Sequence, residues 1–324
     1  MFSEIDYEVI AKESLKSYSI IYEELVYLGK SDNVTFQVNT FDEGLKYLIK
    51  IHISTNSIKT KNVIESELIW LEALARESNL VIPTPVRNLK EELITEISTI
   101  NNEEKINMTL YNWVNGEVLN REPTKNETTS LALLMAALHK HSIQWNIPED
   151  FKRPIYDSDN LYTSLSQLKE LLNLELITRE DFAIIEESVR KISNVIESQK
   201  SSQNSWGIIH SDLHESNYVF YNDSSRPIDF SNCGHGFYLF DIAETFMHLS
   251  IENRKIFIST YSNVHLLQEN YIEVLEAFFI WSIVRTFAFH TLNPDEHKSL
   301  SENFPSIIQN YFIKYLREEN FLLS

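Results

Sequence analysis

Two short polar motifs joined by a predicted hairpin constrain the fold of this chain more than any other feature. The first motif is His210-Ser-Asp-Leu-His-Glu-Ser-Asn217, and the second is Ile228-Asp-Phe230. The residues between them read as two short strands around a polar turn at 222–225. Because a hairpin returns the chain to its starting point, we expect Asn217 and Asp229 to lie side by side.

The residue types in these motifs suit the transfer of a phosphoryl group to a hydroxyl. Asp212 and Asn217 have the spacing of the catalytic loop of kinases. A carboxylate at the first position orients the attacking hydroxyl, and an amide at the second holds Mg²⁺ on the nucleotide phosphates. Asp229 supplies a second, anionic metal ligand. We therefore predict that Asp212 is catalytic and that Asn217 and Asp229 bind magnesium; the alternative is a polar loop without a function.

A metal-dependent hydrolase is a competing interpretation, because His210, Asp212 and His214 alternate as metal ligands can. A site with two metals needs further clusters of histidine or carboxylate. The other close histidine pair, His139 and His141, ends an apolar run that predicts a core helix. These two histidines are therefore better explained as packed or exposed residues at a helix end.

Three segments carry a resemblance to a known family. The segment Trp206–Asn217, the stretch Ile228–Gly236 and the sequence Phe240-Asp-Ile-Ala243 closely resemble the aminoglycoside phosphotransferase family of kinases. This family includes choline, homoserine and methylthioribose kinases and a branch that phosphorylates protein serine and threonine. The resemblance extends from about Tyr27 to about His290. It implies a two-lobed, protein-kinase-like fold and ATP- or GTP-dependent, Mg²⁺-assisted transfer to a hydroxyl.

The resemblance also assigns structural roles next to the catalytic loop. It implies that Asp241 braces the loop through hydrogen bonds, and we expect His210 to pack beneath the loop and to order Asp212. The sequence places Asp241 at the start of a predicted helix over 241–249, where it would also cap free backbone amides.

A lysine stands inside an apolar, β-branched run, Tyr47-Leu-Ile-Lys-Ile-His-Ile53. Alternation along a strand places Leu48 and Lys50 on one face and Ile49 and Ile51 on the other. A buried ammonium needs an anionic partner, and nucleotide phosphates together with a helix carboxylate provide one. The alternative is an edge strand from which the lysine reaches solvent.

The helix that supplies this carboxylate is predicted over 62–74, where apolar residues recur at helical spacing. It carries both Glu65 and Glu67. The resemblance favours Glu67 as the partner of Lys50, because it places the carboxylate just before an apolar run, and Glu65 remains the alternative. Either residue could also be an ordinary surface glutamate of an amphipathic helix.

The predicted phosphate-binding loop, 28–36, has a single glycine and lacks the Gly-x-Gly-x-x-Gly pattern of protein kinases. It predicts a turn between two strands, with Ser31, Asn33 and backbone amides as donors to phosphate oxygens. The resemblance further implies a hinge between the lobes at about 111–117, where backbone amides of 111–114 pair with the adenine edge.

Strand-like segments dominate before residue 113, and long segments of helical periodicity follow residue 128. We therefore predict an α+β chain with two lobes. Residues 1–113 form the nucleotide-binding lobe, a small antiparallel sheet with one helix. Residues 118–324 form a larger, mainly helical lobe for catalysis and substrate binding.

The formal net charge of −19 disfavours binding to nucleic acid or to an anionic membrane. It favours a cationic acceptor such as an aminoglycoside or an amine-bearing alcohol, but a solvated acidic surface explains it at least as well. Cys233 is the only cysteine, so no intrachain disulfide forms, and the N-terminal residues lack the pattern of a secretory signal. We expect a cytoplasmic protein.

These observations predict phosphoryl transfer from ATP or GTP to the hydroxyl of a small molecule. The alternatives are a serine/threonine protein kinase of the same fold and a nucleotide-binding pseudoenzyme that scaffolds a partner. We expect the helices after residue 128 and the loop at 151–160 to contact the acceptor. Further candidates for this pocket are Glu244, His248, Trp281 and Arg285.

Overall fold

The computed structural model describes residues 4–31, 33–42, 44–53, 60–98, 105–199 and 202–324. The chain divides into two compact units. Unit 1 comprises residues 1–116, 146–153 and 226–231, and unit 2 comprises residues 117–145, 154–225 and 232–324. Two short segments that are distant in sequence from the N-terminal part therefore belong to unit 1.

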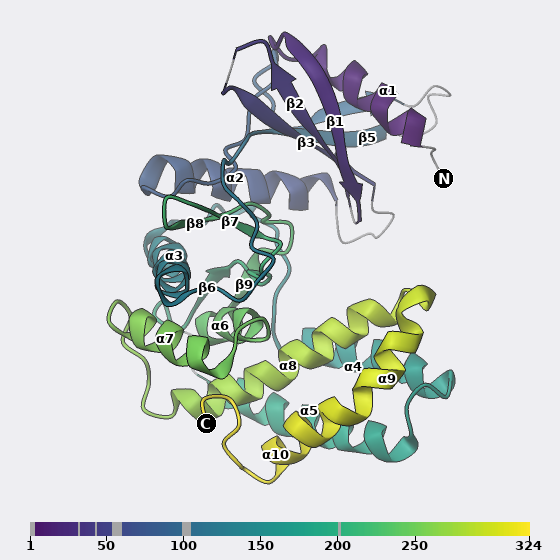
Figure 1. The fold of residues 1–324 in the computed structure, drawn as a ribbon, viewed down its shortest axis with the longest axis vertical. Helices are drawn as coiled ribbons and strands as arrows, with labels where there is room; N and C mark the ends of the chain where they lie inside the picture. Colours follow the sequence, from purple (N-terminus) through teal and green to yellow (C-terminus); the bar gives the residue numbers. More distant parts are fainter. Residues whose placement is uncertain (1–3, 32, 43, 54–59, 99–104, 200–201) are drawn as a thin grey trace. The chain divides into compact units, whose positions relative to one another are not determined.

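Unit 1 is built on a five-stranded antiparallel sheet (Figure 1). The strands lie in the order β1-β2-β3-β5-β4. Their bounds are Tyr22–Lys30 (β1), Asn33–Thr40 (β2), Lys46–His52 (β3), Thr95–Ser98 (β4) and Lys105–Asn112 (β5). Lys50 on β3 is opposite Thr35 of β2 on one side and Thr109 of β5 on the other. The alternative of an edge-strand lysine is therefore wrong.

The two faces of β3 have the predicted environments. Ile49 and Ile51 are fully buried in the hydrophobic core of unit 1, together with Phe36 of β2 and Met108 of β5. Lys50 projects from the opposite face because side chains alternate along a strand. It is also buried, with 4% of its surface exposed, so its ammonium depends on partners within the protein.

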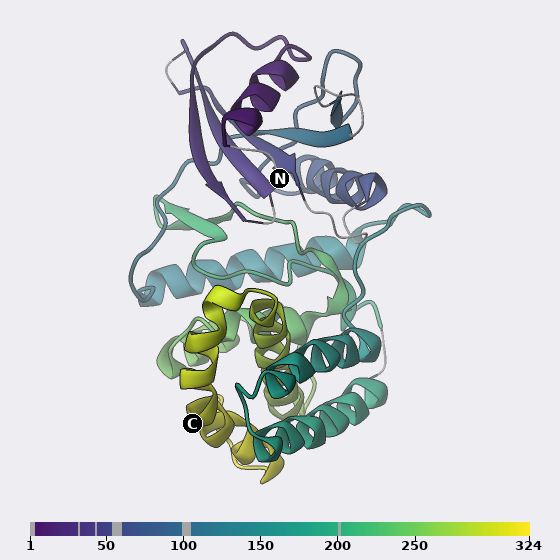
Figure 2. The ribbon, with the colours of Figure 1, turned by 90° about the vertical axis from the view of Figure 1, so that its right-hand side faces the viewer.

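The described residues of unit 1 form two helices, α1 (Glu4–Leu15) and α2 (Lys61–Glu77), where one was predicted. Helix α1 lies against the sheet (Figure 2). Its buried residues follow the spacing of a single helical face. They are Tyr7, Ile10, Ala11, Ser14 and Leu15.

Unit 2 is mainly helical, as predicted. Helix α8 packs against α4 and α6 (Figure 1). Most of its residues are buried. No helix in the described part of the chain is long and apolar enough to span a membrane. The helices are α3 (Lys125–Gln144), α4 (Ser158–Asn173), α5 (Arg179–Ser198), α6 (Tyr238–Phe246), α7 (Ile251–Ser262), α8 (Tyr271–Thr291), α9 (His297–Ile307) and α10 (Ile313–Leu316).

The predicted hairpin between the two motifs is present. Strand β7 (Tyr218–Tyr221) pairs with β8 (Ser224–Pro227). The turn consists of Asn222 and Asp223, which both have positive φ angles of 49° and 61°. Two-residue turns of this kind match the twist of paired strands, and Asn and Asp tolerate their backbone conformation. The turn is therefore shorter than the predicted one, and the second strand begins earlier.

Candidate active site

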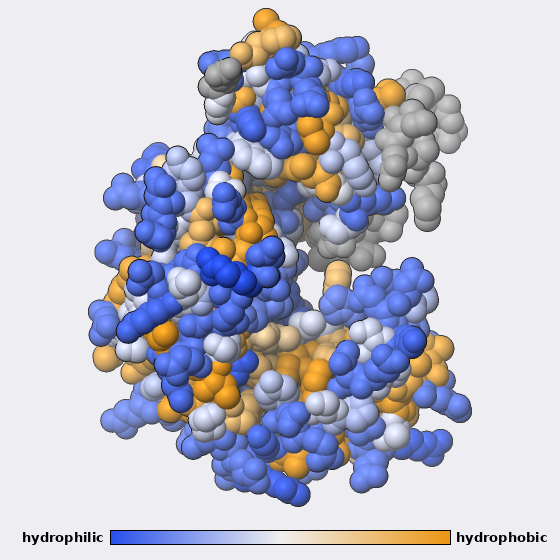
Figure 3. Space-filling model, viewed as in Figure 1, coloured by the Kyte–Doolittle hydropathy of each residue, from blue (hydrophilic) through white to orange (hydrophobic). Residues whose placement is uncertain are grey.

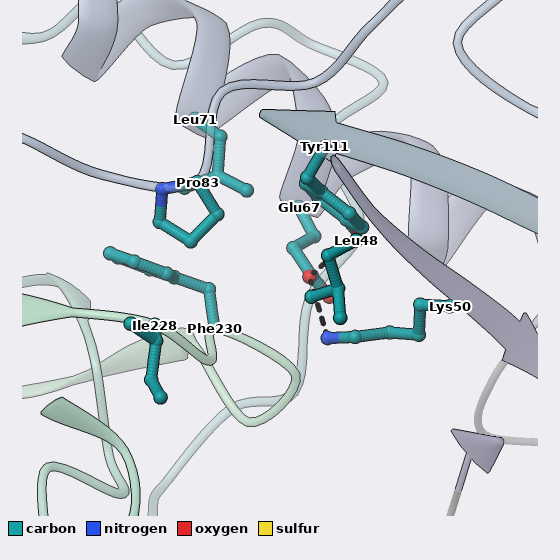
Figure 4. Close-up of a pocket in the computed structure, with 8 residues that line it drawn as sticks. All are labelled: Leu48, Lys50, Glu67, Leu71, Pro83, Tyr111, Ile228 and Phe230. Carbon is teal, nitrogen blue, oxygen red and sulfur yellow. Dashed lines mark hydrogen bonds and ion pairs between the residues drawn. The ribbon is translucent and has the colours of Figure 1, made fainter. Parts of the chain in front are cut away.

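A buried lysine lies between two carboxylates of unit 1. Lys50 Nζ lies 3.8 Å from Glu67 Oε1 (Figure 4). It donates hydrogen bonds to Asp229 Oδ1 and to Ser231 Oγ, each at 3.0 Å. Lys50 belongs to β3, Glu67 to α2 and Asp229 to the segment 226–231. Three parts of the chain thus converge on one ammonium group.

The surroundings of Lys50 and Asp229 favour the charged form of both groups. Burial by itself opposes a charge, but Asp229 and Glu67 outweigh burial and raise the pKa of Lys50 above its ordinary value. Burial would likewise favour the neutral acid at Asp229. The Lys50 ammonium and the hydrogen bond from Ser231 N, at 2.9 Å, instead hold the pKa of Asp229 well below its usual range. The pair is therefore ionised at neutral pH.

Helix α2 presents Glu67, and not Glu65, to Lys50. Glu67 is buried, whereas Glu65 is exposed to solvent. Tyr111 Oη donates to Glu67 Oε1 at 3.4 Å, and Arg153 Nη1 lies 3.6 Å from Glu67 Oε2. The two carboxylate oxygens thus face different partners, which fixes the orientation of the side chain.

Lys50 and Glu67 of this charge cluster line a small pocket of unit 1 (Figure 4). The pocket combines an apolar wall with a fixed cation, and its empty volume is about 180 Å³. The pocket is lined by Lys50, Glu67 and Tyr111 and by the apolar side chains of Leu48, Leu71, Pro83, Ile228 and Phe230.

The predicted phosphate-binding loop is a tight turn between β1 and β2. Ser31 N donates to Asn33 O at 2.9 Å, and Ser31 is exposed; Asp32 lies outside the described residues. Asn33 is the first residue of β2 and is buried, with an Oδ1 atom that has no hydrogen-bond partner in the described part of the chain. Of the two predicted phosphate donors, Ser31 is the one that the turn presents to solvent.

Two of the hinge amides that were expected to meet adenine already have partners in unit 1. Asn112 N donates to Thr84 O at 2.9 Å, and Trp113 N donates to Lys46 O at 3.0 Å. The expectation is therefore wrong for these two amides, because backbone pairing continues one residue beyond the end of β5.

In unit 2 the loop that is predicted to be catalytic, here called the catalytic loop, follows β6 (Trp206–Ile209) and leads into β7. Asn217 Nδ2 donates to the main-chain oxygen of Asp212 at 2.8 Å and to Asp212 Oδ2 at 2.9 Å. Asn232 Nδ2 donates to the same Oδ2 atom at 2.9 Å. His214 Nε2 lies 3.6 Å from Asp212 Oδ1. Two side-chain amides thus orient the carboxylate of Asp212.

Asn232 is a site residue that the sequence analysis missed. It lies three residues after Asp229 in the stretch Ile228–Gly236, but within that stretch the sequence analysis assigned a role only to Asp229. Asn232 and Asp212 are 20 residues apart, and no local spacing links them. The contact depends on how the chain returns after the hairpin.

The oxygen atoms that remain on Asn217 and Asp229 suit a magnesium ion. Asn217 donates through Nδ2, so its Oδ1 carbonyl points away from Asp212. The contacts of Asp229 to Lys50 and Ser231 both use Oδ1, which leaves Oδ2 for a cation. Mg²⁺ prefers neutral and anionic oxygen ligands of this kind. The donor chemistry of both residues therefore fits the predicted role.

A fully buried carboxylate fixes the start of the catalytic loop. Asp241 accepts hydrogen bonds from His210 N at 2.9 Å, from Ser211 N at 2.6 Å and from His139 Nε2 at 3.0 Å. These bonds hold Ser211 at a φ angle of +62°, which non-glycine residues seldom adopt. The bracing role expected of Asp241 is thus confirmed.

The capping role expected of Asp241 is wrong. Helix α6 begins at Tyr238 and not at Asp241, and no side chain caps its N-terminus. The carboxylate of Asp241 is directed to the amides of the catalytic loop, which lie 30 and 31 residues earlier in the sequence.

Helix α8 supports the same loop through a buried ion pair. Arg285 Nη1 lies 2.8 Å from Glu244 Oε2 and donates to Ser211 O at 3.0 Å. Trp281 is fully buried against Phe240, with ring centroids 4.1 Å apart. Of these candidates for the acceptor pocket, Trp281 is therefore a core residue, and Glu244 and Arg285 stabilise the loop.

The histidines considered for a metal site are buried or contact other side chains of the protein. His139 pairs with Asp241 and lies 2.7 Å from Tyr261 Oη, while His210 is completely buried. His248 Nδ1 lies 2.8 Å from Glu215 Oε2. Within the described residues, no group of three or more His, Cys, Asp or Glu side chains is arranged to hold a metal ion. The described residues therefore do not provide the ligands that the metal-hydrolase interpretation requires.

We predict that the free energy of unfolding falls as the pH decreases below about 6.5. Complete burial lowers the pKa of His139 in the folded chain, despite the adjacent carboxylate of Asp241. As the pH falls, His139 therefore binds a proton in the unfolded chain before it does so in the folded chain. The stabilisation is fully present above the pKa of His139 in the unfolded chain and decreases below it. Urea unfolding at several pH values between 8 and 5.5 measures this slope. The slope should be smaller in His139→Gln; an unchanged slope would contradict the assignment.

Comparison with known proteins gives the family of the chain. A model of the phosphotransferase enzyme family (APH) matches residues 25–276. The chain is 26% identical over 243 residues to an uncharacterised protein of Synechocystis sp., a match that covers 72% of this chain and 65% of that protein. It is 22% identical over 241 residues to the amicoumacin kinase of Bacillus subtilis, covering 73% and 66%. The matches thus span slightly less than two thirds of the length of each relative.

The fold is shared with solved kinase structures. A microcompartment-associated aminopropanol kinase superposes with a TM-score of 0.83 over 98% of this chain and 100% of that one, at 20% sequence identity. The predicted α+β, kinase-like fold is therefore confirmed.

Proposed function

Because the chain belongs to the phosphotransferase enzyme family, we propose that it transfers the terminal phosphoryl group of ATP or GTP to a hydroxyl of a small molecule. The observation that carries this proposal is the buried Lys50, which lies between Glu67 and Asp229. A cation held in this way by a strand, a helix and a loop carboxylate is the arrangement that kinases use to hold nucleotide phosphates.

Each predicted site residue of unit 1 has a role in nucleotide binding in this proposal. Lys50 contacts the α and β phosphates, with Glu67 holding its ammonium in place, and Ser31 donates to phosphate oxygens. Asn33 was predicted as a further donor, and its buried side chain makes it the weaker candidate. Backbone amides from Val114 onward meet the adenine edge, since the two before it are paired within unit 1.

The acceptor hydroxyl is oriented by Asp212. The amides of Asn217 and Asn232 hold one oxygen of this carboxylate, so the other oxygen is directed to the hydroxyl proton. Asn217 and Asp229 would hold Mg²⁺. When bound, this ion neutralises the charge of the phosphates.

We propose an amine-bearing alcohol as the acceptor. The chain has 47 acidic against 28 basic residues, and hydrophilic side chains predominate on the face viewed in Figure 3. An acidic surface attracts cations over distances of about 10 Å at moderate salt. Two similar proteins are named as kinases of amicoumacin and of aminopropanol, which supports a small molecule. The single cysteine is consistent with our proposal of a cytoplasmic site of action.

A coupled assay of nucleotide consumption tests the proposal. The purified chain would receive Mg²⁺ with ATP or GTP and one member of an acceptor panel: an aminoglycoside, amicoumacin, aminopropanol, choline, homoserine, methylthioribose or a generic protein. Turnover with one amine-bearing alcohol, and a phosphorylated product in the mass spectrum, is the expected result. Turnover with the protein alone would favour a protein kinase, and nucleotide binding without any turnover would favour a scaffold.

Replacing Glu67 by glutamine is expected to raise the KM for nucleotide by about tenfold. Glutamine keeps the shape of the side chain but removes the charge that fixes Lys50. Initial rates at varied nucleotide concentration measure the change. Glu65→Gln is the matched control, because Glu65 lies two residues earlier on α2 and is exposed. Equal effects of the two variants would contradict the assigned pair.

A further inference from the structure

Residues 152–156, here called the anchor segment, lie between α3 and α4 in the sequence. The first two residues of the segment belong to unit 1 and contact α2. The first amide of the segment donates to Ser66 Oγ at 2.8 Å. Arg153 Nη1 donates to Val63 O at 3.0 Å and lies 3.6 Å from Glu67 Oε2. The three contacted residues recur at helical spacing and therefore share one face of α2. The start of the anchor segment, Lys152 and Arg153, is therefore attached to the face of α2 that carries Glu67.

The same guanidinium group holds the chain just after Asp229. Arg153 Nη2 donates to Phe230 O at 3.3 Å and to Ser231 O at 2.6 Å. The side chain of Arg153 is only 2% exposed, so water does not replace these contacts. The five N–H groups of a planar guanidinium can serve a carboxylate and several carbonyls at the same time, which a lysine ammonium cannot do in this geometry.

The next carbonyl along the chain is held by the other end of the anchor segment. In unit 2, Tyr156 Oη donates to Asn232 O at 2.5 Å, and the side chain of Asn232 donates to Asp212 Oδ2 at 2.9 Å. Tyr156 is buried, and its main-chain amide donates to His235 O at 2.7 Å. The phenol is therefore fixed by both its backbone and its packing.

We propose that Arg153 and Tyr156 are positioning residues for phosphoryl transfer. Three successive carbonyls, of residues 230–232, are held by two side chains of one short segment. The tolerance for misplacement at such sites is small, because reacting groups must lie within a few tenths of an ångström of the productive geometry.

The two residues act on different parts of the site. Arg153 sets the position of Asp229 relative to Glu67, and so acts on the binding of the nucleotide with its cation. Tyr156 sets the position of Asn232, and so acts on the orientation of Asp212. This inference rests on the proposed function, which assigns the first group to the nucleotide and the second to the acceptor hydroxyl.

The two variants should therefore have different kinetic signatures. Arg153→Met is expected to raise the Kd for nucleotide in the presence of Mg²⁺ by about 10- to 100-fold. Tyr156→Phe removes only the hydroxyl and leaves the ring in place. It is expected to lower kcat by about tenfold, with little change in the Kd for nucleotide.

The test uses the full chain and separates binding from turnover. Titration calorimetry with Mg²⁺ and a non-hydrolysable ATP analogue gives Kd, and initial rates with the acceptor from the panel give kcat. The matched controls are Arg190→Met on α5 and Tyr162→Phe on α4, two exposed positions. Thermal unfolding of each variant shows whether it is folded. If Arg153→Met does not fold, Arg153→Lys takes its place and should still raise Kd, since an ammonium cannot reach all four partners.

Two results would overturn the proposal. One is a pair of variants that bind nucleotide and turn over like their controls. The other is a pair of variants that both show the same rise in Kd and the same fall in kcat, which indicates general destabilisation. If the wild-type chain binds nucleotide but phosphorylates no acceptor, the proposed function fails while the Kd of Arg153→Met still decides the role of Arg153.

Discussion

Replacing Asp212 by asparagine is expected to lower kcat by about 10³-fold, the range observed for loss of a general acid or base. The carboxylate receives hydrogen bonds from Asn217 Nδ2 and Asn232 Nδ2. An amide in its place cannot accept the hydroxyl proton, and its NH₂ group would face other donors. The Kd for nucleotide should change little, because Lys50 and Asp229 are in unit 1 and are not altered.

Asp223→Asn is the matched control for this experiment. Asp223 is exposed in the turn of the β7–β8 hairpin, with a positive φ angle that asparagine also tolerates. The same exchange of a carboxylate for an amide should leave kcat unchanged there. Single-turnover rates with and without acceptor distinguish loss of chemistry from loss of binding. Turnover of Asp212→Asn at the wild-type rate would refute the role of Asp212.

Replacing Asp241 by asparagine is expected to lower the free energy of unfolding by about 3 kcal/mol. Asp241 is fully buried, and both of its oxygens accept hydrogen bonds. An amide NH₂ in place of either oxygen would face an N–H group of the catalytic loop, and at least one buried donor would lose its partner. The loop would then no longer hold Ser211 at its positive φ angle, so kcat should also fall.

Chemical denaturation of Asp241→Asn and of a surface control measures this loss. Asp159→Asn is a suitable control because Asp159 also lies in the first turn of a helix, α4, but is exposed. Its unfolding free energy should change by no more than about 0.5 kcal/mol. Equal midpoints for wild type and Asp241→Asn would show that the carboxylate does not brace the loop.

The alternation of side chains along β3 was readable from the sequence. Apolar residues on both sides of Lys50 predicted a central strand, and the structure places β3 between β2 and β5. The hairpin after Asn217 was readable for a similar reason, since Asn222 and Asp223 are residue types that favour turns. Both features depend only on residues close in sequence.

Local patterns were less reliable where a helix begins. The prediction that Asp241 starts a helix and caps it was wrong, because α6 already begins at Tyr238. An aspartate in a first helical turn can serve its own helix or any other donor in reach. The amides of His210 and Ser211 became its partners through packing that no nearby residue indicates.

The choice between Glu65 and Glu67 also required the tertiary structure. Two residues apart on a helix, they point in directions about 160° apart. The sequence predicts a helix with an apolar face but does not state which carboxylate is turned to β3. Packing of α2 made Glu67 the buried partner of Lys50 and left Glu65 exposed.

The sequence by itself determined the secondary structure around the two motifs, the types of the reactive residues and the kind of fold that the chain adopts. Only the tertiary structure decided which polar side chains hold the predicted site residues in position. Arg153 lies 86 residues from Glu67 and 78 from Ser231, and Asn232 lies 20 from Asp212. Short-range spacing reflects the geometry of a helix, strand or turn, whereas such distant contacts arise when whole elements pack, and packing is a property of the complete chain.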